Sequence, residues 1–65
     1  MGLLTEAEAQ AMTGKELVDA VAYNVHGAAF FSRVTDYDCN CNTLWKEARR
    51  RGDESLYERG YRRAE

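Results

Sequence analysis

The chain has 65 residues, a formal net charge of −2 and 45% hydrophobic residues. A chain of about 60 residues forms one domain with a small core, because it buries only about 60% of the surface that its unfolded form exposes. That size leaves little room for a pocket that encloses a substrate, and the nearly balanced charge does not by itself indicate binding to nucleic acid or anionic lipid.

The two cysteines, Cys39 and Cys41, are too few for a disulfide framework. With one residue between them in an extended segment, their side chains would point to opposite sides, so we expect no bridge between them. No apolar run reaches the roughly 18 residues of a membrane span, and the amino terminus lacks the pattern of a secretory signal. We therefore expect a cytoplasmic protein with reduced thiols and no membrane segment.

The amino-terminal half predicts two helices. Residues 4–12 form a short one, with Thr5 as its N-cap. A longer helix is predicted over residues 14–33, because Thr13 and Glu16 have the spacing of a capping box, in which each side chain accepts a hydrogen bond from the other residue's backbone amide.

The predicted helix over residues 14–33 is apolar around most of its circumference. Its polar residues fall on one narrow stripe that Phe30 interrupts: Asp19, Tyr23, His26 and Arg33. Such a helix needs apolar neighbours on most sides, so we expect it to be the long apolar centre of the fold.

The carboxyl-terminal half predicts a loop and two further helices. Residues 34–42 are rich in Thr, Asp and Asn, whose side chains compete with helical hydrogen bonds, and are expected to be a loop. Helices are expected over residues 43–51 and 54–64, with Gly52 ending the first of them. The fold class is thus all-α, a single domain of three to four helices over residues 1–65, with the long apolar helix at its centre.

The remaining segments supply few large apolar side chains to cover the central helix. Each exposed Val or Phe forfeits about 1.5–3 kcal/mol of burial free energy, a large share of the stability of a small domain. We therefore expect a homodimer, because symmetric dimers are the commonest oligomers. The residues expected to pack in it are Val21, Val25, Ala28 and Phe31. The alternative is that one chain covers the whole helix by itself.

Two patterns could indicate a metal site. Residues 36–42 followed by Glu47 have the oxygen spacing of an EF-hand calcium loop, but Cys41 occupies the position where the turn needs glycine. Cys39 and Cys41 with His26 give three soft ligands, whereas a structural zinc site needs four. An ordinary Asx-turn with a helix cap is the preferred interpretation, and no metal or cofactor is predicted.

His26 with Asp19 and Tyr23 is the most plausible set of acid and base groups in the sequence. Nothing in the spacing orients these side chains as a catalytic triad, and the chain has no glycine-rich phosphate loop. The interpretation is a surface histidine that makes one hydrogen bond. The protein is therefore not expected to be an enzyme.

Basic residues gather after residue 44, where three aromatic residues also lie, and acidic residues predominate before it. Arg, Trp and Tyr are enriched at protein interfaces, which predicts a protein-binding surface. The residues predicted to form it are Trp45, Arg49, Arg50, Tyr57 and Tyr61. The same side chains could bind DNA or RNA, although interspersed acids at i, i+4 spacing weaken that alternative.

The function expected from these features is binding to a partner protein. A small chain without catalytic groups is typical of an accessory or regulatory protein that modulates its partner, for instance an inhibitor of a host protein carried by a phage or other mobile element. The competing hypothesis is a small DNA- or RNA-binding regulator that uses the Arg-rich carboxyl-terminal helices.

Overall fold

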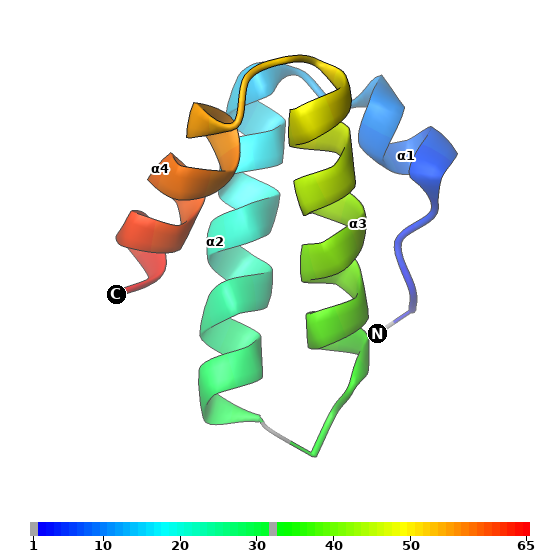
Figure 1. The fold of residues 1–65 in the computed structure, drawn as a ribbon. Helices are drawn as coiled ribbons and strands as arrows, with labels where there is room; N and C mark the ends of the chain where they lie inside the picture. The colour runs from blue at the N-terminus through cyan, green and yellow to red at the C-terminus, as the bar shows by residue number, and fades with distance from the viewer. Residues whose placement is uncertain (1, 32) are drawn as a thin grey trace.

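The computed structural model describes residues 2–31 and 33–65, and this part of the chain contains four α-helices (Figure 1). Their bounds are Glu6–Ala11 for α1, Gly14–Phe30 for α2, Asp36–Arg50 for α3 and Ser55–Ala64 for α4. The helices α2 and α3 run antiparallel side by side, with α1 beside α3 and α4 beside α2 (Figure 1). The expected all-α class is confirmed.

The first two helices begin with capping boxes. The backbone N–H of Glu8 donates to the hydroxyl of Thr5 over 3.1 Å, and that of Glu16 donates to Thr13 over 3.2 Å. The backbone amide of each Thr donates in return to the Glu side chain, which lowers the pKa of both carboxyls. Both predicted N-caps are confirmed, and they fix where the chain enters each helix.

A Schellman motif separates α3 from α4. Gly52 adopts a φ of 70°, which a residue with a β-carbon rarely does. Its N–H donates to the carbonyl of Arg49 over 2.9 Å, and the N–H of Asp53 donates to that of Ala48 over 3.0 Å. The predicted helix stop at Gly52 is therefore confirmed, and it turns the chain so that α4 can pack on α2.

The predicted loop over residues 34–42 is wrong from residue 36 onward, because α3 begins at Asp36. Asp36 and Asp38 lie in its first turn, where negative charge offsets the positive end of the helix dipole. Asn40 is buried within the same stretch and bonds to other segments. Charge at the helix start and tertiary contacts outweigh the weak helix propensity of these residues.

The expectation of a long apolar central helix is also wrong. The helix α2 has 17 residues, ends at Phe30 and buries one face only. On its opposite face Tyr23 is 60% exposed and Phe30 is 70% exposed. The helices α3 and α4 cover only the inner face, and large exposed apolar side chains remain at Tyr23 in the middle of the helix and at its carboxyl end.

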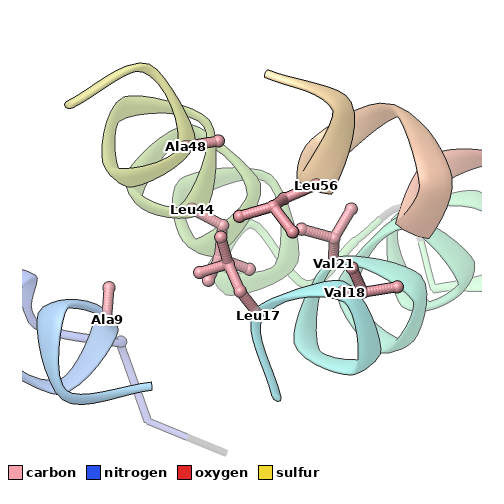
Figure 2. Packing of buried hydrophobic residues seen from close by; sticks show 7 residues of the cluster. All are labelled: Ala9, Leu17, Val18, Val21, Leu44, Ala48 and Leu56. Atoms are coloured by element: carbon pink, nitrogen blue, oxygen red, sulfur yellow. The ribbon is translucent and has the colours of Figure 1, made fainter. Parts of the chain in front are cut away.

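The core lies where α2, α3 and α4 meet, and α1 closes one side of it (Figure 2). Leu17, Val21 and Leu44 are its largest fully enclosed side chains. The complete buried cluster is Ala9, Leu17, Val18, Val21, Leu44, Ala48 and Leu56. This small core is consistent with the modest stability expected of a short chain.

Two glycines allow close packing between helices. A β-carbon on Gly60 would lie 2.6 Å from the Cβ of Val21, so α4 can approach α2 this closely only because Gly60 has no side chain. A β-carbon on Gly27 would lie 2.3 Å from the ring of Tyr37. The small residue at position 27 therefore accommodates a side chain of α3 in the same chain.

Buried polar groups tie the segments together. The N–H of Leu4 donates to Asn40 over 2.7 Å, the amide of Asn40 donates to Asn24 over 3.1 Å, and Asn24 donates to the carbonyl of Ala20 over 2.8 Å. This series links the amino-terminal segment to α3 and α2. Because each donor has a partner, the two buried asparagines specify how these segments pair without leaving an unsatisfied amide.

Candidate protein-binding groove

An open groove with a volume of about 810 Å³ lies between α3 and α4. Its lining residues are Asp38, Cys41, Asn42, Trp45, Glu54, Tyr57, Glu58, Tyr61, Arg62 and Glu65. The α3 residues recur at spacings of three and four, as do those of α4, so each helix presents one continuous face. The groove is open to solvent and does not enclose a ligand on all sides.

Three aromatic rings form the apolar wall of the groove. Trp45 meets Tyr57 edge to face with ring centroids 5.2 Å apart, and Tyr57 lies 6.3 Å from Tyr61. Tyr61 is 46% exposed, whereas Trp45 and Tyr57 are half-buried. Since each ring is held by its neighbour, this wall presents apolar surface that loses little conformational entropy when it is covered.

Arg49 lies at the edge of the aromatic wall. Its guanidinium carbon is 5.8 Å from the centre of the Trp45 ring, within the range of a cation–π contact. Arg49 thus contacts the indole from within α3, and Tyr57 contacts it from α4.

Charge in the groove is predominantly negative. The lining includes four carboxylates, on Asp38, Glu54, Glu58 and Glu65, and one guanidinium, on Arg62. Arg62 donates to Glu58 over 2.6 Å, which offsets one of the four negative charges. The surface between α3 and α4 is therefore acidic, although the sequence after residue 44 is on balance basic.

Cys41 and Tyr57 meet at the base of the groove, where burial raises the pKa of both groups, that of Tyr57 to about 12. The thiol and the phenol are consequently protonated at neutral pH. A protonated thiol is a poor nucleophile and a poor metal ligand. The groove thus offers hydrogen-bonding and apolar surface, without an activated nucleophile at this position.

The structure brings together four of the five residues predicted for protein binding: Trp45, Arg49, Tyr57 and Tyr61. Arg50 lies elsewhere. Its guanidinium binds the carboxylate of Glu47, with Nε 2.8 Å from Oε1, on the side of α3 that faces α1. Arg50 therefore does not contribute to the wall of the groove.

Acidic residues of the groove are the part that sequence reasoning missed. The loop expected over residues 34–42 contains Asp38 and Asn42. In the structure both residues lie on α3, on the same helical face as Trp45. Glu54 and Glu65 lie at the two ends of α4. The usable signal was the spacing of positions 38, 41, 42 and 45, which is helical once α3 is extended to its true start.

The four residues expected in a dimer interface have different environments. Val21 is fully buried within one chain and leaves no surface for a second copy. Val25 and Ala28 are half-buried, while Phe31 is 56% exposed. Phe30 and Val34 are also exposed, and these three residues at or just after the end of α2 are hereafter called the α2-end patch.

The residues considered for metal binding and catalysis do not converge. Asp36, Asp38 and Asn40 lie on the helix α3, so they do not form the turn of a calcium loop, and the expected Asx-turn is also replaced by helix. His26 stacks against Phe30 with ring centroids 4.5 Å apart. In the described part of the chain, no three His, Cys, Asp or Glu side chains form a metal-binding group.

Ion pairs neutralise much of the positive charge of the carboxyl-terminal half. Of its seven basic side chains, Arg50 and Arg51 bind Glu47, Arg62 binds Glu58 and Arg63 binds Asp19. Arg51 also donates to the carbonyls of Ala9 and Met12 over 3.1 and 2.6 Å. It therefore fastens α1 to α3 rather than facing outward.

In the described residues, no helix combines the length and the apolar character that a membrane crossing requires. Comparison with protein-family models, with curated proteins and with solved structures finds no match to this chain. The α3–α4 groove is therefore the basis for a proposed function.

Proposed function

We propose that this chain is a small protein-binding accessory or regulatory protein whose α3–α4 groove binds a partner protein and modulates its activity or assembly. The observation that carries the proposal is the cluster of Trp45, Tyr57 and Tyr61 on an open groove, with Tyr61 46% exposed. Tryptophan, tyrosine and arginine dominate the energetic centres of protein interfaces.

Geometry of the aromatic wall supports an interface role. The rings are ordered by contact with one another and with Arg49, so a partner would bury them at a small cost in side-chain entropy. A domain of this size gains stability by burying aromatic rings, and keeping Tyr61 at the surface forgoes part of that gain. Partial exposure of the wall is thus well explained by a partner that covers it.

The distribution of charge favours a protein over DNA or RNA as the partner. A surface that binds phosphates needs several unpaired cations on one face. Here Arg50, Arg51, Arg62 and Arg63 are in ion pairs, and the groove itself is lined mainly by carboxylates. The cations beside the aromatic rings are Arg49 at the edge of the groove and Arg62, which is paired with Glu58, and the carboxylates of the lining outnumber them.

The test is affinity capture from a lysate of the source organism, with the chain immobilised as wild type, Tyr61→Ala or Leu3→Ala. Tyr61→Ala should reduce the captured partner by about 30-fold, the effect of losing about 2 kcal/mol at an interface centre. Leu3→Ala changes an exposed apolar side chain outside the groove and should leave capture unchanged.

Circular dichroism of the three proteins checks that they are equally folded. Retention of every captured protein by Tyr61→Ala would contradict the proposal. Nuclease-sensitive capture that weakens steeply as salt is raised would support the nucleic-acid alternative instead.

We also propose that two copies associate through the α2-end patch. Phe30 and Phe31 are 70% and 56% exposed, and covering such rings is worth about 1.5–3 kcal/mol each. A second copy supplies a matching patch by symmetry. Sedimentation equilibrium should show a dimer that Phe30→Ser converts to a monomer, and a wild-type chain that stays monomeric at high concentration would refute this part.

A further inference from the structure

We infer that the occupant of the α3–α4 groove is a basic amphipathic segment of the partner protein, with a large apolar side chain against the aromatic wall and Lys or Arg beside it. The inference rests on the proposed protein-binding function and specifies the chemistry of the partner. It follows from the charge that surrounds the wall.

Carboxylates flank the aromatic wall at both ends of α4. Glu54 precedes the first turn of the helix and Glu65 follows its last turn, while Asp38 lines the groove from α3. Glu58 is already paired with Arg62. An occupant with cations placed along its length would therefore meet negative charge at each end of the groove and across it.

An acidic or phosphate-bearing occupant would be disfavoured at the same surface. Like charges brought together across an interface cost several kcal/mol, and that cost selects against wrong partners. The guanidinium of Arg62 already donates to Glu58, which offsets part of its positive charge and weakens its attraction for an incoming anion. The aromatic wall, by contrast, accepts both apolar side chains and cations on its ring faces.

A randomised peptide display library, selected on the purified wild-type chain and counter-selected on Tyr61→Ala, tests the inference. Enriched peptides should carry a net positive charge and at least one Phe, Leu, Met or Trp. Synthetic copies of them should bind more weakly as salt is raised, because exposed ion pairs are screened. Binding is measured by calorimetry.

Single charge removals provide matched variants. Glu54→Gln or Glu65→Gln should weaken the selected peptide about two- to fivefold, the effect of one exposed ion pair. Glu6→Gln removes the same charge from α1, outside the groove, and should leave the affinity unchanged.

Enrichment of acidic or uncharged peptides, equal binding to Tyr61→Ala, or a library without binders would each overturn the inference. If Tyr61→Ala still abolishes capture of the natural partner in any of these cases, the protein-binding function stands and only the basic occupant is rejected. If that capture is independent of Tyr61, the proposed function itself fails.

Discussion

Glu47 is a charged residue placed inside the fold. It is 5% exposed, and its two carboxylate oxygens accept hydrogen bonds from Arg50 over 2.8 Å and from Arg51 over 2.5 Å. These hydrogen bonds lower its pKa to about 2. Two guanidinium partners offset the cost of burying this charge, so the carboxylate links α3 to the arginine that holds α1.

Replacing Glu47 with Gln should lower the free energy of unfolding by about 1–3 kcal/mol, because charge-assisted hydrogen bonds to both arginines are lost. Urea denaturation measures the change. The matched control is Glu58→Gln, which breaks the exposed ion pair with Arg62 and should cost less than about 0.5 kcal/mol. Equal effects of the two variants on the free energy of unfolding would show that the burial of Glu47 does not strengthen its ion pairs.

Gly60 is a second residue on which packing depends. In Gly60→Ala the new β-carbon would lie 2.6 Å from the Cβ of Val21 and 2.7 Å from the carbonyl oxygen of Val18, so α4 must move away from α2. Overpacking of this kind costs about 1–3 kcal/mol, measurable by thermal unfolding.

Gly14 provides the control for that substitution. A β-carbon there would lie 3.5 Å from Leu56, an ordinary contact, and alanine favours the helix more than glycine does. Gly14→Ala should therefore be neutral or stabilising. A neutral Gly60→Ala would mean that the contact between α2 and α4 is not closely packed.

For single residues, the sequence predicted the helix N-caps and the aromatic residues of the groove, but it did not predict the buried polar side chains. Asn24 lies seven residues after Leu17 and so falls on its helical face, yet an asparagine there is not distinguishable from a surface one without its partner. That partner is Asn40, from a segment expected to be a loop. A long-range side-chain pair has no local sequence signal.

One arginine fastens the end of α1 to α3. The guanidinium of Arg51 donates to the carbonyls of Ala9 and Met12 at the end of this short helix, where the Ala9 carbonyl also accepts from the N–H of Met12. Its side chain is 21% exposed, compared with 59% for Arg50. The hydrogen bonds of Arg51 therefore affect the position of α1 more than the packing of the core.

Arg51→Lys should loosen α1 while the rest of the fold stays intact, because an ammonium group cannot reach the carboxylate and the carbonyls with the planar fork of a guanidinium. Hydrogen exchange of the α1 amides should become about tenfold faster, and exchange in α2 should not change. Arg50→Lys is the control, because Arg50 is the other partner of Glu47 and its hydrogen bonds go to that carboxylate and not to the α1 carbonyls. Unchanged exchange in α1 would show that the arginine is dispensable there.

Helix starts and stops were predictable wherever a specific side chain or glycine sets them. Thr5, Thr13 and Gly52 are such residues, and their motifs have short sequence signatures. The start of α3 was not predictable, because Thr35 makes no side-chain cap and the following residues favour turns when considered alone. Contacts of Asn40 and Tyr37 with α2 supply what local propensity lacks.

The whole molecule should lose stability in acid. The pKa values of Glu8, Glu16 and Glu47 are all lowered in the folded chain. Groups with a lowered folded pKa stabilise the protein above their unfolded pKa and lose that effect as pH falls through the folded value. The melting temperature should therefore fall between about pH 4.5 and about pH 2, the folded value of Glu47.

Thermal unfolding followed by circular dichroism across that pH range checks the prediction. Glu47→Gln should flatten the profile, because the group with the most strongly lowered pKa is gone. A melting temperature that is independent of pH over this interval would contradict the assignment.

The location of the groove could not be predicted from overall charge. The acidic-first, basic-last order of the sequence indicated a cationic surface on the carboxyl-terminal helices, but the fold pairs four arginines with acids and directs carboxylates into the groove. The aromatic residues were predictable because their type alone marks an interface. Which charges surround them depends on how α3 and α4 face one another.

Trp45 is the only tryptophan of the chain, and it lies in the wall of the groove. The indole is half-buried, so its emission wavelength depends on how much water reaches the ring. Any molecule that settles on the wall would shield it and move the emission toward the blue. The intrinsic fluorescence of Trp45 can thus report whether the groove is occupied, without an added label.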